Sequence, residues 1–313
     1  MNQRQVGVVG LGLMGQGICT SLLASGFEVV GYDISSQRRQ SVNQGISDAL
    51  NDGESTSMHD WPSRFHCADR YDTFAACDFV VESVPEKLDT KRQTLEQLEE
   101  VLAPEVPIAT NTSALPISYV QSQCRVPQRV IGMHWAEPCH LTRFLEVIRG
   151  EQTDDATVEK TVQLGKRLGK DPTIVQRDVP GFIVNRLAYA MYREAFWLLE
   201  NDVADVETID RAFVNAISVW ANFAGPFRWM DLTGLPAYAQ VMSRLFPELS
   251  CEQETPQSIQ QLVEQGAKGI ENGHGFYEYT PDQASQWQVK WRENVQLLQQ
   301  LNEETSLASK ENP

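Results

Sequence analysis

Two patterns of apolar and polar residues alternate along the first half of this 313-residue chain. Short apolar runs rich in β-branched residues predict strands, and stretches with apolar positions three or four residues apart predict helices. The predicted strands cover residues 6–9, 28–32, 78–82, 106–110, 129–133, 144–148 and 172–175, and helical patterns lie between them, as over 89–102 and 157–168. Strands that alternate with helices in this way build a parallel, doubly wound sheet, so the first half predicts an α/β fold.

The pattern changes after Pro180-Gly181, a pair that is typical of a turn. Beyond it we find helical periodicity, over residues 182–201, 205–216, 234–246, 256–266 and 281–301. A chain of this length can form two domains that each have a core. We therefore predict an α/β domain at residues 1–179, followed by an all-helical domain at residues 180–313.

The first predicted strand leads into Gly10-x-Gly12-x-x-Gly15, which has the spacing of a dinucleotide-binding turn. Gly10 allows the tight turn, Gly12 lets phosphates approach the backbone, and Gly15 lets the next helix pack close to the strand. The N-terminus of that helix offers free N–H groups and the positive end of its dipole to a pyrophosphate. The motif predicts a Rossmann-type domain with a bound dinucleotide.

Asp33 ends the second predicted strand and follows the first glycine at about the 20-residue spacing of this fingerprint. A carboxylate at this point accepts hydrogen bonds from the adenosine ribose hydroxyls and repels the 2′-phosphate of NADP. We therefore expect NAD as the cofactor. Arg38 and Arg39 follow closely and keep NADP open as the alternative.

Composition narrows the class of protein. The net charge of −16 at pH 7 argues against a nucleic-acid-binding surface, which needs clustered basic residues. No apolar run reaches the ~18 residues of a membrane span, and the first five residues lead into a strand without an apolar signal segment. The six cysteines lie far apart, as expected for reduced thiols in the cytoplasm, and we predict no metal site.

Four polar residues stand where a sheet of this type would expose them to a ligand: Ser113, His134, Glu146 and Asn185. Ligands bind beyond the carboxyl ends of such strands, where we expect Ser113 and His134 to follow their strands. Glu146 lies inside an apolar strand, and a buried carboxylate needs a partner, which an imidazole on the neighbouring strand would supply. His134 alone is more typical of a core histidine, but the pair beside an NAD site favours a catalytic base.

Ser113 and Asn185 are of the residue types that can hold an alkoxide-like oxygen while a secondary alcohol is oxidised. Each has an equally plain structural interpretation. Ser113 could cap a turn, and Asn185 could be an amide on a helix surface.

The whole chain resembles the 3-hydroxyacyl-CoA dehydrogenase family, whose members include carnitine and gulonate dehydrogenases and lambda-crystallin. Matching segments occur in the same order from end to end, and they read Gly-Leu-Gly-Leu-Met-Gly (10–15), Val-Val-Glu-Ser-Val-Pro-Glu-Lys-Leu-Asp-Thr-Lys (80–91), Asn-Thr-Ser (111–113), Gly-Met-His-Trp-x-x-Pro (132–138), Leu-Glu-Val-Ile (145–148), Pro-Gly-Phe-Ile-Val-Asn-Arg (180–186) and Gly-Phe-Tyr-Glu-Tyr (275–279).

This resemblance implies an NAD-dependent enzyme of fatty acid metabolism that oxidises a (3S)-hydroxyacyl substrate to the 3-keto product. It implies that His134 is the general base, that Glu146 orients it, and that Ser113 and Asn185 donate hydrogen bonds around the reacting oxygen. The cofactor-binding residues that it implies, together with those of the glycine motif, are Gly10, Gly12, Met14, Gly15, Asp33, Glu86 and Lys91. A homodimer through the helical domain is also implied.

The sequence departs from the CoA-using members of the family where they would receive CoA. Those members commonly read His-Phe-Phe-Asn-Pro, and this chain has Glu137 in place of the asparagine. Residues 34–64 match a lysine-rich helical segment of the family, yet they contain no lysine and more acids than arginines. Glu271 replaces a further lysine, whereas Arg143 is placed to hold a carboxylate, unless it simply faces solvent. A free β-hydroxy carboxylate is therefore the alternative substrate.

Two other interpretations give different chemistry or none. The β-hydroxyacid dehydrogenases that resemble 6-phosphogluconate dehydrogenase use a lysine early in the domain-joining helix, and this chain has no lysine between Lys170 and Lys268. A non-catalytic NAD-binding protein is the remote alternative, and the combination of His134 with Glu146 speaks against it. Turnover of NADH with a 3-keto acid or thioester separates these interpretations.

Overall fold

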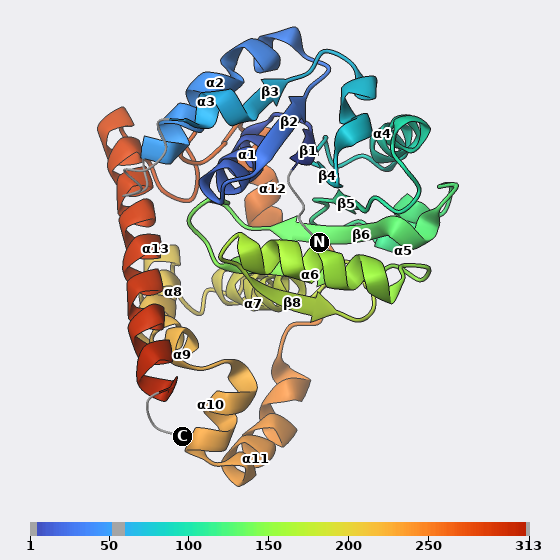
Figure 1. Cartoon of the computed structure of the whole chain (residues 1–313). Helices are drawn as coiled ribbons and strands as arrows, with labels where there is room; N and C mark the ends of the chain where they lie inside the picture. The colour runs from blue at the N-terminus through green and yellow to red at the C-terminus, as the bar shows by residue number, and fades with distance from the viewer. Residues whose placement is uncertain (1–4, 52–59, 311–313) are drawn as a thin grey trace. The chain divides into compact units, whose positions relative to one another are not determined.

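A computed structural model describes residues 5–51 and 60–310 of the chain (Figure 1). The chain forms two compact units, which divide between Arg186 and Leu187. In the described part of the first unit the elements are β1 (Gln5–Val9), α1 (Leu13–Ala24), β2 (Glu28–Tyr32), α2 (Ser36–Asn51), α3 (Trp61–Arg64), β3 (Phe65–Cys67), β4 (Phe79–Glu82), α4 (Leu88–Val101), β5 (Ile108–Thr110), α5 (Ile117–Gln121), β6 (Val130–Trp135), β7 (Phe144–Ile148), α6 (Asp155–Arg167) and β8 (Asp171–Val175).

The strands form one eight-stranded sheet in the order β3-β2-β1-β4-β5-β6-β7-β8. All neighbouring pairs are parallel except β6 and β7, which are antiparallel, so β7 and β8 run against the other strands. The sheet is therefore mostly parallel, as predicted, and it departs from the parallel arrangement at β7 and β8. Only residues 136–143 connect β6 to β7, which is too short for the crossover that a parallel neighbour requires.

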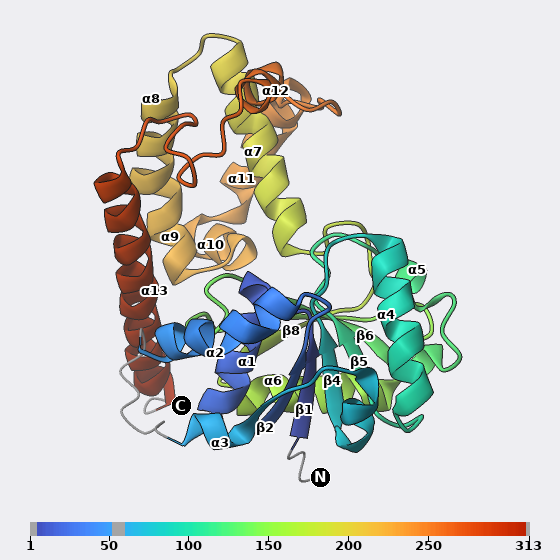
Figure 2. The same ribbon diagram turned by 90° about the horizontal axis from the view of Figure 1, so that it is seen from above.

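Both faces of the sheet are covered, which explains why its strands are apolar runs rather than alternating patterns. One core cluster packs α1, α2 and α6 against alternate strand residues such as Val8, Val81 and Met133. The other cluster packs α4 and α5 against the opposite face, at residues such as Val80 and Ile148. Figure 2 shows α1 and α2 on one side of the strands and α4 and α5 on the other, the doubly wound Rossmann-type arrangement that the alternation predicts.

Element boundaries differ from the predictions in ways that matter for the site. β6 continues to Trp135, so His134 lies within the strand. The sequence had predicted a position just after the end of the strand. This extension is possible because Met133 and Trp135 pack into the core on one face while His134 faces the other. Helix α2 and strand β3 were not predicted, since the residues of α2 are mostly polar.

Among the described residues of the second unit, the regular elements are helices, and isolated β-bridges join Gly269 to His274 and His274 to Glu278. Its helices are α7 (Val184–Glu200), which begins in the first unit, α8 (Val206–Ala212), α9 (Ser218–Phe223), α10 (Pro226–Thr233), α11 (Leu235–Leu245), α12 (Gln257–Glu264) and α13 (Pro281–Lys310). A π-helical turn joins α8 to α9. Among the described residues, no helix combines the length and the apolar character that crossing a lipid bilayer requires.

Candidate active site

The glycine loop lies where the strand order reverses, between β1 and β4. Gly10 has φ of 95°, and a Cβ on it would lie 2.4 Å from the Ser83 carbonyl oxygen. A Cβ on Gly15 would lie 1.8 Å from the Gly10 carbonyl oxygen. Both contacts exclude a side chain, so α1 can pack tightly behind the loop. Ligands of doubly wound sheets bind at this reversal point.

The N-terminus of α1 fits the pyrophosphate of a dinucleotide. Gly12 is the N-cap residue, and no side chain caps the helix there. A Cβ on Gly12 would meet no atom within 4 Å, so the space in front of the helix is open. Uncapped N–H groups, an open approach and the positive end of the helix dipole together suit a pyrophosphate. Met14, in the first turn of this helix, is half-buried against Cys139.

The carboxylate of Asp33 is fixed by the backbone on both of its oxygens. Oδ2 accepts a hydrogen bond of 2.8 Å from the N–H of Leu11 in the glycine loop, and Oδ1 accepts one of 2.8 Å from Ser35. Arg38 lies 3.5 Å from Oδ2 but is half exposed. The side chain of Asp33 is buried, with 4% of its surface exposed. A negative charge is therefore held rigidly beside the predicted ribose site.

We expect NAD(H) to bind at least about tenfold more tightly than NADP(H), a difference of about 1.4 kcal/mol. The fixed charge of Asp33 would face the 2′-phosphate of NADP(H), and the exposed Arg38 offsets it only in part. Calorimetric titration of both cofactors measures the ratio. Asp33→Asn, which removes the charge, should narrow it. Equal or tighter binding of NADP(H) by the unaltered protein would contradict the prediction.

His134 and Glu146 form a buried pair at the edge where β6 ends. They are direct partners in the antiparallel register of β6 and β7, so both side chains leave the same face of the sheet. His134 Nδ1 lies 2.8 Å from Glu146 Oε2, and the two residues are 6% and 1% exposed. The rings of Phe144 and Phe182 flank the imidazole, with centroids 5.6 and 5.8 Å away. The pair is thus held in an apolar setting. Nδ1 of the imidazole faces Glu146, and Nε2 is the ring nitrogen that does not.

The second oxygen of Glu146 binds the start of α7. Oε1 accepts hydrogen bonds from the backbone N–H groups of Ile183, at 3.0 Å, and Val184, at 3.1 Å. A buried carboxylate is costly without such partners, and here both of its oxygens are hydrogen-bonded. The carboxylate is therefore oriented from two sides.

Glu86 holds the loop that carries Ser113. Its Oε1 accepts hydrogen bonds from the Thr112 hydroxyl and from the N–H groups of Ser113, at 3.0 Å, and Ala114, at 3.2 Å. Burial alone would raise the pKa of Glu86, but the hydrogen bond from Thr112 and the charge of Lys91 outweigh it and lower the pKa. Asn185 Nδ2 donates to the Ser113 carbonyl oxygen at 2.7 Å, so these two predicted site residues are in contact.

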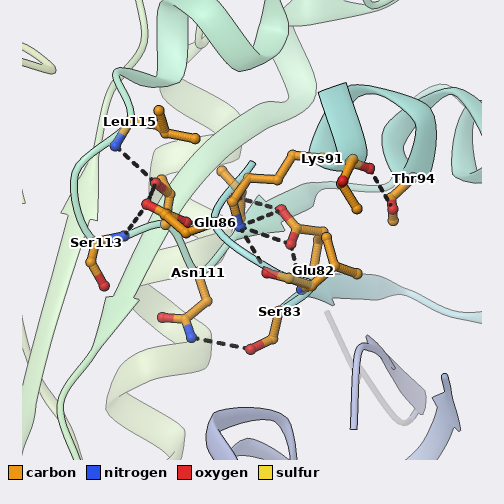
Figure 3. A network of polar contacts seen from close by, with 12 residues as sticks. Glu82, Ser83, Glu86, Lys91, Thr94, Asn111, Ser113 and Leu115 are labelled. Atoms are coloured by element: carbon orange, nitrogen blue, oxygen red, sulfur yellow. Dashed lines mark hydrogen bonds and ion pairs between the residues drawn. The ribbon is translucent and has the colours of Figure 1, made fainter. Parts of the chain in front are cut away.

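Lys91 links Glu86 to a fully buried carboxylate, Glu82 (Figure 3). Lys91 Nζ lies 3.0 Å from Glu82 Oε1 and 3.2 Å from Glu86 Oε2, and Lys91 and Glu82 are both 0% exposed. Thr110 donates to Glu82 Oε2 at 2.6 Å. Glu82 was missed in the sequence, although an acid at the end of an apolar strand is the same signal that drew attention to Glu146. The ammonium of Lys91 is enclosed, and its direct contact with a cofactor stays a prediction.

Asn111 connects the cofactor side of the sheet edge to the strand of His134. Its Nδ2 donates to the Ser83 hydroxyl at 3.2 Å, and its Oδ1 accepts from the Trp135 N–H at 3.1 Å. Ser83 in turn packs against Gly10. The glycine loop and the His134–Glu146 pair therefore lie along one continuous edge of the sheet.

Lys170 and Arg143 lie around the connection between β6 and β7. The buried ammonium of Lys170 donates to the carbonyl oxygens of Cys139 and Thr142, and burial lowers its pKa to about 8. Sequence reasoning missed this lysine, because no pattern marks a contact to backbone carbonyls. Arg143 is exposed and lies just before β7, and its role as a carboxylate clamp stays a prediction. In the part of the chain described here, no group of three potential ligands could hold a metal ion.

Known protein families match both halves of the chain. Residues 5–179 match the 3-hydroxyacyl-CoA dehydrogenase NAD binding domain, and residues 181–279 match the 3-hydroxyacyl-CoA dehydrogenase C-terminal domain. The chain is 34% identical to the 3-hydroxybutyryl-CoA dehydrogenase of Bradyrhizobium diazoefficiens over 88% of this chain and 95% of the relative. It is 32% identical to the 5-formyl-3-hydroxy-2-methylpyridine 4-carboxylate 5-dehydrogenase of Mesorhizobium japonicum, over 92% and 94%.

Solved structures show the same two kinds of relative. A crystal structure of a 5-formyl-3-hydroxy-2-methylpyridine 4-carboxylic acid 5-dehydrogenase, described as an NAD⁺-dependent dismutase, aligns with a TM-score of 0.86 and 30% identity, covering 96% of this chain and 98% of that one. The (S)-3-hydroxybutyryl-CoA dehydrogenase of Ralstonia eutropha aligns with a TM-score of 0.74 and 31% identity, covering 89% and 100%.

Proposed function

We propose that this chain oxidises a (3S)-hydroxyacyl substrate to the 3-keto product. The chain belongs to the 3-hydroxyacyl-CoA dehydrogenase family and is an NAD-dependent dehydrogenase. The observation that carries the proposal is the His134–Glu146 pair, whose 2.8 Å contact lies on the same sheet edge as the glycine loop. In the division of labour that we propose, residues 1–179 bind NAD and residues 180–313 contribute to substrate binding.

In this proposal His134 Nε2 removes the hydroxyl proton of the substrate. Glu146 holds Nδ1 of the imidazole protonated, so Nε2 is free to act as the base, and the carboxylate stabilises the imidazolium that forms. NAD, when bound, accepts the hydride that leaves the carbon. Ser113 and Asn185 stabilise the alkoxide-like oxygen, and their mutual contact keeps both groups near the start of α7.

A free hydroxy carboxylate is a second candidate substrate, favoured by the relatives of this chain. The pyridine carboxylic acid dehydrogenase aligns with a TM-score of 0.86, compared with 0.74 for the (S)-3-hydroxybutyryl-CoA dehydrogenase. The lysine-free stretch at residues 34–64 points the same way, although its residues 52–59, with Asp52 and Glu54, lie outside the described residues.

One comparison of substrates tests this proposal. We expect acetoacetyl-CoA to exceed free 3-keto acids by more than about 10²-fold in kcat/KM at one pH, equivalent to about 2.7 kcal/mol. The oxidation of NADH is followed with the thioester, with the free acids, and with an aromatic aldehyde carboxylate of the class named for the Mesorhizobium relative. A free acid as the better substrate would establish the second candidate. In that case Arg143→Ala should remove most of the preference, and an unchanged ratio would exclude Arg143 from the site.

We also propose that the chain forms a homodimer through its helical unit. Within residues 187–301, whose side chains are all described, only Ala224, Ser250 and Val295 are buried. Large apolar side chains such as Phe223 and Phe227 are more than two-thirds exposed. Apolar surface on this scale is typical of an interface.

A reducing, cytoplasmic location is proposed on the basis of the cysteines, all of which are free thiols.

A further inference from the structure

The turn that precedes α7 has a backbone conformation that side chains other than glycine rarely adopt. Gly181 has φ of 77° and Phe182 has φ of 52°, both in the left-handed region. Phe182 is nevertheless a buried aromatic residue, and its ring contacts the His134 imidazole. A bulky residue in this region is strained, and such strain persists only where the surrounding structure requires it.

The strained turn directs two backbone N–H groups at one carboxylate oxygen. Ile183 and Val184 donate to Glu146 Oε1 at 3.0 and 3.1 Å, while Glu146 Oε2 lies against His134. Val184 is the first residue of α7, so these donors belong to the positive end of a 17-residue helix. The carboxylate cannot rotate toward or away from the imidazole without breaking these bonds.

We propose that the N-terminus of α7, presented by the turn at Gly181 and Phe182, holds Glu146 and thereby positions His134 for proton transfer. Ile183 and Val184 act as positioning residues through their backbone, and this inference rests on the proposed role of His134 as the base. The positive end of the helix also stabilises the negative charge of Glu146, which weakens the attraction between the carboxylate and the imidazolium. It therefore limits how strongly the imidazolium is held, which a base that must release its proton requires.

His134 and the N-terminus of α7 are the groups that act on the charge of the Glu146 carboxylate. His134 faces it from β6, and the α7 N-terminus faces it from the linker. The register partner on β8 is the uncharged Thr173, and the rings of Phe144 and Phe182 flank the imidazole.

Val184→Pro tests the proposal by removing one donor. Proline is tolerated at the first position of a helix, where it lacks only the N–H in question. Its reference is Val184→Ala, which keeps the N–H and loses the side chain. Val206→Pro is the matched control, because Val206 is the valine at the first position of α8 and belongs to the second unit. We expect kcat of Val184→Pro to be about five- to twentyfold below that of Val184→Ala, with NADH affinity within about twofold.

The pH profile separates positioning from general loss of structure. With one N–H removed, more of the carboxylate charge faces the imidazole, which holds its proton to higher pH. The acid limb of kcat/KM for oxidation should therefore move up by about half a pH unit in Val184→Pro, and down in Glu146→Gln. Gly181→Ala, which places a side chain at positive φ, should show the same upward shift if Val184→Pro does not fold.

The inference is overturned if Val184→Pro matches Val184→Ala in kcat and in pH profile, or if both proline variants lose activity equally without a shift of the acid limb. Failure of the proposed function looks different. In that case the unaltered protein turns over none of the keto substrates, or His134→Gln retains normal turnover.

Discussion

Replacement of His134 by glutamine is expected to lower kcat by about 10² to 10⁴, the range typical for loss of general base catalysis. Glutamine can fill the space between Phe144 and Phe182 and hydrogen-bond Glu146, but it cannot accept a proton near neutral pH. NAD binds at the glycine loop and Asp33, so we expect its affinity to change by less than about twofold. Steady-state rates at saturating NAD, with NADH binding followed by fluorescence, measure both quantities.

His66→Gln provides the matched control, since His66 is an exposed histidine on β3 of the same sheet. Its kinetics should equal those of the unaltered protein. Glu146→Gln should also slow the chemical step, by about 10²-fold, because the amide group would donate to His134 Nδ1 and leave the proton on Nε2. If His134→Gln keeps near-normal turnover with the best of the substrates compared, whether acetoacetyl-CoA, a free 3-keto acid or the aldehyde carboxylate, His134 is reassigned as a structural residue.

The sequence predicted the fold through features that are local in the chain. The glycine spacing, the apolar strands and the change of pattern after residue 180 each depend on neighbouring residues alone, and the structure confirms the doubly wound sheet and the helical second half. The direction of β7 was also within reach, because a connection of residues 136–143 is too short for a parallel crossover. The continuous apolar runs of both strands hid this, since they fit either direction.

Contacts between distant residues were much harder to predict. The strand pattern placed Glu146 in a buried setting and suggested an imidazole partner, but it did not give the register that makes His134 its direct neighbour. The hydrogen bond from Ile183 to Glu146 joins residues 37 apart and depends on a left-handed Phe182, which no propensity favours. Lys91 shows the same limit, because helical periodicity could not indicate that a lysine on α4 is fully enclosed.

Replacement of Lys91 by methionine is expected to destabilise the protein by about 3–5 kcal/mol at pH 7, the usual cost of removing one partner from a buried ion pair. Methionine fills much of the lysine volume, so the loss would come from Glu82, which is left as a buried carboxylate with Thr110 and the Val84 N–H as its remaining partners. Urea unfolding of the variant and of the unaltered protein measures the difference. Lys166→Met, at an exposed position of α6, is the control and should change stability by less than about 0.5 kcal/mol.

The reason for the loss can be tested by restoring neutrality. In the Glu82→Gln, Lys91→Met double variant no charge is buried at this point, so it should be more stable than Lys91→Met alone. The deficit of Lys91→Met should also shrink as the pH falls toward 5, because the lone carboxylate can then take up a proton in the folded state, whereas the intact pair gains nothing from that change. Lys91 also contacts Glu86, which holds the Ser113 loop, so kcat should fall in Lys91→Met even where the protein is fully folded. A loss below about 1 kcal/mol that does not depend on pH would show that water reaches Glu82 once the lysine is gone, and that the buried pair does not fix this edge of the sheet.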